Sequence, residues 1–305
     1  MTTQRQRIAT RMSRWVQKPL LSGIRSHAMA RRLFEMNAAL LHMKPSGLRI
    51  RPEVLHHGAD TVPCAWIDRG GRTERGVVLY LHGGGFVLGS VKGYAHLIGC
   101  LAEAAEMAGL GVDYRLAPEH PFPAALDDAM TAYLALLDRC APSRIAIVGD
   151  SAGGTLALAL LHRIGAEGLP YPGAVAAVSP ATDMTGASPS LHENRRSDVL
   201  VPLDWAERGV RAYARDTDPR DPRLSPLFGR FAGAPPVMIQ VVTEEVLRDD
   251  GRRMAEALRA QGVEVRLDEW SGVPHVWHLL CGWTEEADRG IADIADFIRE
   301  HVPAA

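Results

Sequence analysis

The stretch RIAIVGDSAGGTLALAL, residues 144–160, passes from a β-branched run through a cluster of small residues into an Ala/Leu run. The first run favours a strand and the last favours a helix. Glycine costs conformational entropy inside either element, so glycines clustered at the junction indicate a backbone geometry that only glycine tolerates. The pattern GDSAG at 149–153 matches G-x-S-x-G, in which a sharp strand-to-helix turn lifts the serine hydroxyl clear of the backbone. We therefore predict that Ser151 is a nucleophile.

Outward from this junction, apolar β-rich runs alternate with helical runs along most of the chain. Strands are predicted over 51–57, 62–67, 77–81, 111–114, 144–148, 174–179, 236–242 and 263–270. Helices are predicted over about 92–107, 124–139, 152–164, 251–261 and 286–302. This alternation implies an α/β fold in which a mostly parallel, eight-stranded sheet is flanked by helices. The first two strands, which a short turn separates, are expected to form an antiparallel hairpin at one edge.

Two segments fall outside the alternation, and both are too long for ordinary loops. They are residues 1–45 and an insertion near 184–225. We expect them to meet over the carboxyl edge of the sheet as a helical cap. Residues 46–305 would then form the catalytic domain that carries the insertion.

The N-terminal segment is strongly basic, because its first 34 residues contain eight Lys or Arg and no acidic residue. Within it, Ile8, Met12, Trp15 and Val16 fall at helical spacing, which predicts an amphipathic helix. We expect its apolar face to pack on the body of the protein, and a helix lying on a membrane surface is the alternative. The segment lacks the apolar run and following small-residue cleavage site of a secretory signal, so the expected location is cytoplasmic.

Composition excludes several other classes of protein. The 305 residues include 34 Lys and Arg against 36 Asp and Glu, without the basic excess typical of a nucleic-acid-binding protein. The sequence contains no run of 18 apolar residues, which a membrane span would require, so no stable membrane insertion is expected. The four cysteines lie far apart in sequence and are interpreted as buried apolar residues of a reducing compartment, with neither a disulfide framework nor a metal site.

A second glycine-rich stretch, YLHGGGFVLGS at 80–90, follows the predicted strand 77–81. HGGG-type motifs form the oxyanion hole of esterases, where backbone N–H groups stabilise the negative charge that develops during acyl transfer. We predict Gly84, Gly85 and Ala152 as these donors. His82 is expected to hold the shape of the loop.

The general base is expected in WSGVPHVWHLL, which follows the last predicted strand. In folds with a G-x-S-x-G turn of this kind the histidine comes after the nucleophile and the acid in the chain, on a loop beyond the final strand. His275 lies in the loop itself, whereas His278 begins an apolar helical run. We predict His275 as the base and His278 as a packed residue.

The acid that orients the histidine is sought in QVVTEEVLRDDGRRM, where Glu244, Glu245, Asp249 and Asp250 compete. A loop position favours Glu245 over Asp249, because Asp249 falls within the following helix. Asp183 is a further alternative, although a turn-capping role fits it better.

Taken together, these motifs make the chain resemble the hormone-sensitive-lipase family of α/β-hydrolases, the bacterial family IV esterases. The resemblance covers roughly residues 50–300. It rests on HGGGF at 82–86, DYRLAPEHPFPAALDD at 113–128, GDSAGG at 149–154, EVLRDD at 245–250 and PHVWH at 274–278.

The resemblance implies the same nucleophile, histidine and oxyanion donors, and an N-terminal helical cap. It also implies that a belt formed by Tyr114, Arg115, Glu119 and Asp128 braces the oxyanion loop. One departure is that the family acid motif D-P-L-x-D begins here with Glu245, which keeps Asp249 open as the acid. Family members are often dimers, so a homodimer is an expectation for this chain.

The expected function is that of a serine carboxylesterase that hydrolyses small or short-acyl esters through an acyl-enzyme on Ser151, without metal or organic cofactor. The expected partner is a small-molecule ester substrate. Alternatives are a lactone hydrolase or a deacetylase of the same fold, and a non-catalytic protein that binds small molecules.

Overall fold

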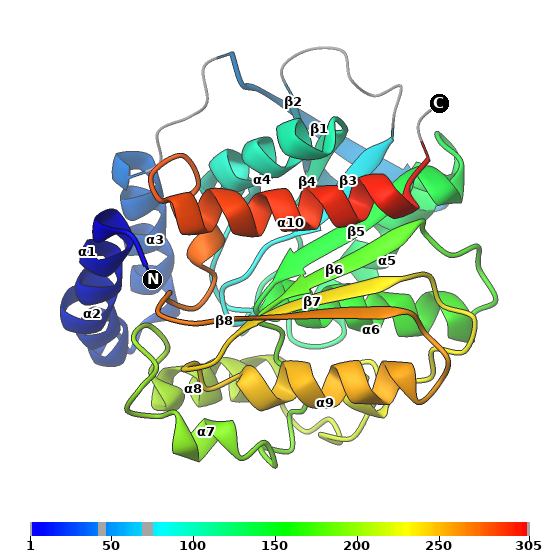
Figure 1. Ribbon diagram of the computed structural model, residues 1–305. Helices are drawn as coiled ribbons and strands as arrows, with labels where there is room; N and C mark the ends of the chain where they lie inside the picture. The colour runs from blue at the N-terminus through cyan, green and yellow to red at the C-terminus, as the bar shows by residue number, and fades with distance from the viewer. Residues whose placement is uncertain (1, 42–46, 69–75, 304–305) are drawn as a thin grey trace.

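Eight strands form one sheet in the order β1-β2-β4-β3-β5-β6-β7-β8 (Figure 1). The structure is a computed structural model that describes residues 2–41, 47–68 and 76–303. The strands are β1 Arg49–His57, β2 Asp60–Asp68, β3 Val77–Leu81, β4 Ala108–Val112, β5 Ile145–Asp150, β6 Ala174–Val178, β7 Val237–Val242 and β8 Val265–Trp270. β1 and β2 form the predicted antiparallel hairpin, β2 also pairs antiparallel with β4, and all other pairs are parallel.

The central strands are buried on both faces, as their continuous apolar sequences predict. Successive side chains point to opposite faces of the sheet. Leu79 and Ile147 therefore belong to one core cluster, while their neighbours Val78 and Val148 belong to the other.

Helices cover both faces of the sheet, which confirms the predicted α/β class (Figure 1). α4 and α10 pack against each other over one face, and α5, α6 and α9 cover the opposite face. Their bounds are α4 Val91–Ala105, α5 Ala124–Leu137, α6 Ala152–Ala166, α9 Arg248–Arg259 and α10 Glu285–His301.

β4 begins at Ala108, three residues before the predicted strand 111–114. Glycine disfavours strands in general, which makes the run AGLGV a poor match to a strand pattern. Here the glycines are needed for close packing, because a Cβ at Gly109 or Gly111 would come within 2.7 Å of side-chain atoms of α4. The requirement comes from a neighbouring helix and is not visible in the local sequence.

The two segments outside the sheet pattern are helical and contact each other. The N-terminal segment forms α1 Gln4–Met12, a π-helical turn Ser13–Gln17, α2 Lys18–Gly23 and α3 His27–Leu41. The insertion forms α7 Ser190–Glu193 and α8 Leu203–Ala214. Lys18 Nζ donates to the backbone oxygens of Arg195 and Asp198. The boundary predicted between residues 45 and 46 lies outside the described residues.

The orientation expected for the N-terminal helix is wrong. Gln6, Ala9 and Ser13 face the body of the protein, whereas the apolar residues Ile8, Met12, Trp15 and Val16 are exposed. Two of the buried polar groups bond within the segment, because the Gln6 amide nitrogen donates to Thr10 Oγ1 and Ser13 Oγ donates to Gln17 Oε1, whereas the Gln6 amide oxygen has no partner among the described residues. The small Ala9 side chain permits close approach, so the helix docks through its polar and small residues.

Among the described residues, no helix combines the length and the apolar character that crossing a membrane requires.

Candidate active site

Ser151 occupies the turn between β5 and α6, with φ 51° and ψ −119°. A positive φ is uncommon for a residue with a side chain and costs about 1–3 kcal/mol, which the surrounding structure must supply. Gly149 and Gly153 permit the turn, because a Cβ on Gly149 would collide with the backbone of Gly153, and one on Gly153 with the carbonyl of Leu81. The Ser151 side chain is partly exposed and its N–H donates to Val178 O at 2.7 Å.

The GGGF loop after β3 has three successive residues with positive φ: Gly84 at 119°, Gly85 at 59° and Phe86 at 63°. This turn leaves the N–H groups of Gly84 and Gly85 without an acceptor among the described residues, and the same holds for Ala152 at the first position of α6. Free N–H groups of this kind, together with the positive end of a helix dipole, favour a developing oxyanion.

Asp150 connects the loop that carries the predicted oxyanion donors, the oxyanion loop, to the turn that carries the predicted nucleophile Ser151. Its Oδ1 accepts from Tyr80 Oη at 2.8 Å and from Gly83 N at 3.0 Å, and its Oδ2 accepts from Tyr94 Oη at 3.2 Å. Burial raises the pKa of the Asp150 carboxyl to about 6, although the Tyr80 hydrogen bond favours its charged form. Because Asp150 precedes Ser151, the loop and the nucleophile share one anchor.

His275 and Glu245 are in direct contact. His275 Nδ1 donates to Glu245 Oε2 at 2.6 Å, and both side chains are buried. The other carboxylate oxygen of Glu245 accepts from Val242 N at 2.8 Å. Burial alone would lower the pKa of the His275 imidazole, but the hydrogen bond to Glu245 and its charge outweigh this effect, so the pKa lies above its ordinary value.

The structure does not join all the predicted residues by hydrogen bonds. Among the described residues, the Ser151 hydroxyl makes no hydrogen bond. His275 nevertheless lies within electrostatic range of Asp150, the residue before Ser151. A contact between nucleophile and base is often loose without substrate and tightens when substrate binds.

The other candidate acids are engaged elsewhere. Glu244 accepts from Ser271 Oγ and Gly272 N. Asp249 pairs with Arg248 and accepts from Ser190 N. Asp250 accepts from Thr182 N and Asp183 N, and Asp183 caps its own turn through Thr185 and pairs with Arg253.

The two histidines interpreted as structural are both fully enclosed. His82 Nδ1 donates to Gly83 O at 2.8 Å, and the ring stacks on Tyr114 with 4.2 Å between ring centroids. Burial lowers its pKa to about 4. His278 Nε2 donates to Gln240 Oε1 at 2.7 Å, and burial lowers its pKa to about 3. Both rings are therefore neutral near pH 7.

Of the four belt residues, Tyr114 bonds the oxyanion loop directly, whereas the other three form ion pairs. Tyr114 Oη donates to His82 O at 2.7 Å. Arg115 forms an ion pair with Asp128 at 2.8 Å, and Glu119 pairs with Arg31 of α3 at 2.7 Å.

The contact between Arg31 and the oxyanion loop was missed by sequence reasoning. Arg31 Nε donates to Val87 O at 2.7 Å and its Nη2 donates to Ala117 O at 2.8 Å. The N-terminal segment therefore holds the oxyanion loop directly. No local signal marks this arginine among its seven basic neighbours.

Asn194 and Asp198 of the insertion were also missed. Asn194 Nδ2 donates to the backbone oxygens of Thr243 and Glu245, and Asp198 Oδ2 accepts from Val246 N at 3.0 Å. These bonds fix the loop that carries Glu245.

α8 packs on the oxyanion loop at Gly209. A Cβ at this buried position would lie 2.8 Å from Gly85 O, and a Cβ on Gly85 would lie 3.1 Å from the Trp205 ring. The helix of the insertion therefore limits where Gly85 can lie.

Gly209→Ala is expected to displace the oxyanion loop and to lower kcat/KM by about tenfold or more, because an imperfectly placed donor loses part of its contribution. The measurement is steady-state hydrolysis of a soluble ester. Gly23→Ala is the matched control, since a Cβ there meets nothing within 4 Å. Equal activities of the two variants would show that α8 does not position the loop.

A cavity of about 220 Å³ opens beside His275 and Glu245. Thr10 and Arg14 of the N-terminal segment line it, as do Ser197 to Val199 of the insertion. Neither Ser151 nor the predicted oxyanion donors Gly84, Gly85 and Ala152 line this cavity.

One group of side chains in the described part of the chain has the residue types to hold a metal ion. The ligand atoms of His96, Cys100 and Cys281 lie within 4.8 Å of one another. The two cysteines lie far apart in sequence. They come together because α4 carries His96 and Cys100, and the segment before α10 carries Cys281. None of the three contacts the Ser151 turn or the His275–Glu245 pair.

Comparison with known proteins agrees with this geometry. Residues 78–279 match a family model described as alpha/beta hydrolase fold. An acetyl-hydrolase of Streptomyces hygroscopicus is 39% identical over 77% of this chain and 78% of its own length. An esterase of Acinetobacter venetianus is 38% identical over 72% of this chain and 74% of its own. The crystal structure of an esterase from the bacterial hormone-sensitive lipase family superposes with a TM-score of 0.91 at 33% identity, covering 99% of this chain and 100% of the other.

Proposed function

Because this chain belongs to the alpha/beta hydrolase fold family, among the hormone-sensitive-lipase-like esterases, and is a carboxylic ester hydrolase, we propose that it cleaves short-acyl esters through an acyl-enzyme on Ser151. The observation that carries the proposal is the hydrogen bond between the buried pair His275 and Glu245, taken together with a serine held on a strained turn. This is the arrangement of base and orienting acid that activates a hydroxyl nucleophile.

In the first half of the reaction, His275 Nε2 accepts the Ser151 proton as Oγ attacks the ester carbonyl carbon. The carbonyl oxygen becomes negatively charged and accepts hydrogen bonds from Gly84, Gly85 and Ala152 N–H. Glu245 stabilises the imidazolium that forms. When the C–O bond to the alcohol breaks, the imidazolium donates its proton to the leaving oxygen, and an acyl-serine remains.

In the second half, water replaces the alcohol. His275 accepts a proton from water, whose oxygen attacks the acyl carbon, and the same three donors stabilise the second oxyanion. The bond to Ser151 Oγ then breaks, the serine recovers its proton from His275, and the carboxylic acid leaves. These steps use only the named residues and water.

A short acyl group is the substrate that fits the packing at the oxyanion loop. Trp205 of α8 lies against Gly85, so a bulky aromatic side chain borders the position at which the carbonyl must bind. We further propose that residues 1–45 and the insertion near 184–225 act together as a cap. The contacts of Lys18 and Arg14 with the backbone at 195–198 support this assignment.

The test is a panel of p-nitrophenyl esters from acetate to dodecanoate, together with small lactones, offered to the purified protein. We expect the highest kcat/KM for acetate to butyrate and a fall of about tenfold or more for longer chains, because each methylene that a site does not accommodate changes discrimination by about tenfold or more. Faster turnover of lactones would transfer the assignment to a lactonase. Binding without turnover of any member would identify a non-catalytic protein.

A further inference from the structure

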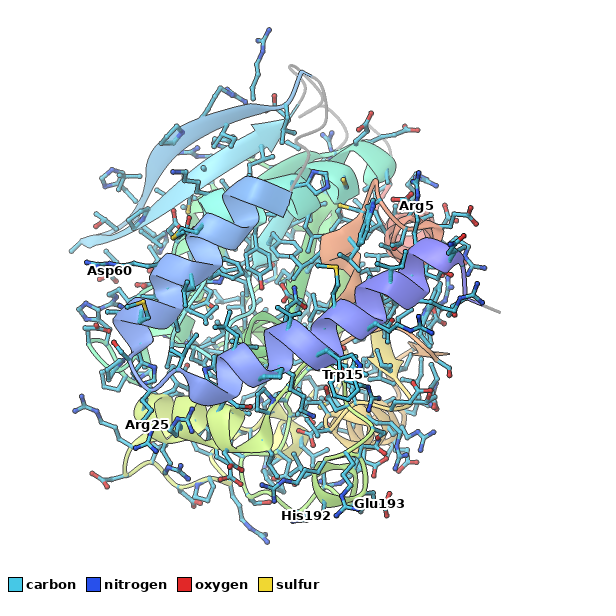
Figure 2. The ribbon with its side chains drawn as sticks, turned by 90° about the vertical axis from the view of Figure 1, so that its left-hand side faces the viewer. Arg5, Trp15, Arg25, Asp60, His192 and Glu193 are labelled. Atoms are coloured by element: carbon cyan, nitrogen blue, oxygen red, sulfur yellow. The ribbon has the colours of Figure 1, made fainter. Side chains whose placement is uncertain are left out.

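The N-terminal helical segment turns its apolar side chains toward solvent. We define the apolar N-terminal face as Ile8, Met12, Trp15 and Val16, whose exposed fractions are 44%, 43%, 74% and 57%. Positions 8, 12 and 15 are spaced by four and three residues, so they lie on one side of the helix. Figure 2 shows this helix lying across the front of the molecule, with Arg5 near one end and Trp15 labelled along its length. Scattered exposed apolar residues are ordinary, but several on one helical face indicate an interaction surface.

Unpaired positive charges adjoin this face. Arg7 and Arg11 are exposed, and their guanidinium groups make no hydrogen bond or ion pair within the described part of the chain. The first 34 residues contain eight Lys or Arg and no acidic residue, whereas the rest of the chain has 26 Lys or Arg against 36 acidic residues. The positive charge is therefore concentrated on the segment that exposes the apolar face.

We propose that the apolar N-terminal face, with Arg7 and Arg11 beside it, is a docking surface for a bilayer that contains anionic lipid. Helices that bind at the surface of a bilayer place Trp and aliphatic side chains at the level of the headgroups and basic residues against anionic phosphates. A second copy of this chain fits less well, because a two-fold interface would bring the same arginines of both copies together. The segment lies on the surface and does not insert as a span.

Docking through this face would bring the cavity beside His275 and Glu245 close to the lipid. Thr10 and Arg14, on the same helical segment, line the cavity that also contains His275 and Glu245. Arg14 and Lys18 bond to the backbone at 195–198, so the segment is attached to the insertion and carries it along. Bilayer binding itself does not depend on the proposed esterase chemistry.

The test measures binding of the full chain to sedimented vesicles. One set is phosphatidylcholine alone, and the other contains about one-third phosphatidylglycerol, enough to give a negative surface potential. We expect the natural protein to sediment with the anionic vesicles, and added salt to weaken this binding. The double variant Arg11→Glu/Trp15→Ser is expected to need about tenfold more lipid, or beyond, for half-maximal binding.

A control of the same design exists outside the N-terminal segment, at residues 220–228. Arg220 and Phe228 are also exposed, and the guanidinium lies over the ring at 5.5 Å from its centroid. Arg220→Glu/Phe228→Ser makes the same change of charge and also replaces an exposed aromatic residue with serine, and is expected to bind vesicles like the natural protein. Both double variants are expected to hydrolyse a soluble ester within about twofold of the natural rate, since exposed surface substitutions disturb the fold little.

Three outcomes would overturn the proposal. The natural protein could fail to sediment with anionic vesicles, or the Arg11→Glu/Trp15→Ser variant could bind them as well as the control. Alternatively, light scattering could show that this variant converts a dimer into a monomer, which would make a second copy the occupant of the face. Ester hydrolysis is measured separately, so loss of vesicle binding with normal turnover contradicts only the docking proposal.

Discussion

Ser151→Ala is expected to lower kcat/KM for p-nitrophenyl acetate by about 10⁵-fold, because it removes the only atom that can carry the proposed acyl group. Some residual turnover is expected, since the oxyanion donors and His275 remain in place and still favour direct attack by water. The natural protein is also expected to gain the mass of one sulfonyl group on Ser151 when it is treated with phenylmethylsulfonyl fluoride.

The matched control is Ser143→Ala, an exposed serine in the turn before β5. It is expected to keep full activity and to take up the reagent. Thermal unfolding of both variants should follow that of the natural protein, because neither change removes a buried contact. Activity of Ser151→Ala within tenfold of the natural rate would refute an acyl-enzyme on this residue.

The parts of the fold that could be predicted are those encoded within a few consecutive residues. The buried strand β5 and the turn at Ser151 follow from β-branched residues next to glycines, and both effects are local. The same is true of the loop at Gly84 and Gly85, since only glycine adopts these backbone angles without strain. The position of β4 could not be read in this way, because Gly109 and Gly111 serve the approach of α4.

The acid illustrates a different limit of sequence reasoning. Four carboxylates lie within seven residues after β7, and chain order alone does not say which one points toward the histidine loop. Their contacts depend on segments distant in sequence, because Ser190 and Asn194 hold the two ends of this loop. Arg31 and Gly209 were invisible for the same reason, since each acts through a backbone group that the fold brings close.

The N-terminal helix was misjudged because periodicity shows that one face is apolar and does not show which face is buried. The usual assumption is that the apolar face packs inward. Here the opposite face docks, fixed by Thr3, whose N–H and hydroxyl both bond the Glu286 carboxylate.

Glu245→Gln is the second large effect, and we expect it to lower kcat by about 10³-fold, since the amide neither stabilises the imidazolium by charge nor secures the correct tautomer of His275. The pH dependence adds a direction. His275 must be neutral to accept the Ser151 proton, so activity falls as pH decreases through its pKa. In the natural protein that pKa lies above its ordinary value because the hydrogen bond and charge of Glu245 outweigh burial.

Removing the charge leaves burial as the dominant influence on His275, and burial favours the neutral ring. The acidic limb of the kcat/KM profile is therefore expected to move to lower pH in Glu245→Gln, while kcat falls at every pH.

Asp249→Asn is the matched control, because Asp249 pairs with Arg248 and Ser190 and does not contact the imidazole. It is expected to keep activity within about tenfold and to leave the acidic limb in place, although the lost ion pair costs some stability. A residue that only supports the loop would lower activity without moving the limb, so the shift separates the orienting acid from a structural one. The reverse pattern, with the shift in Asp249→Asn, would transfer the role to Asp249.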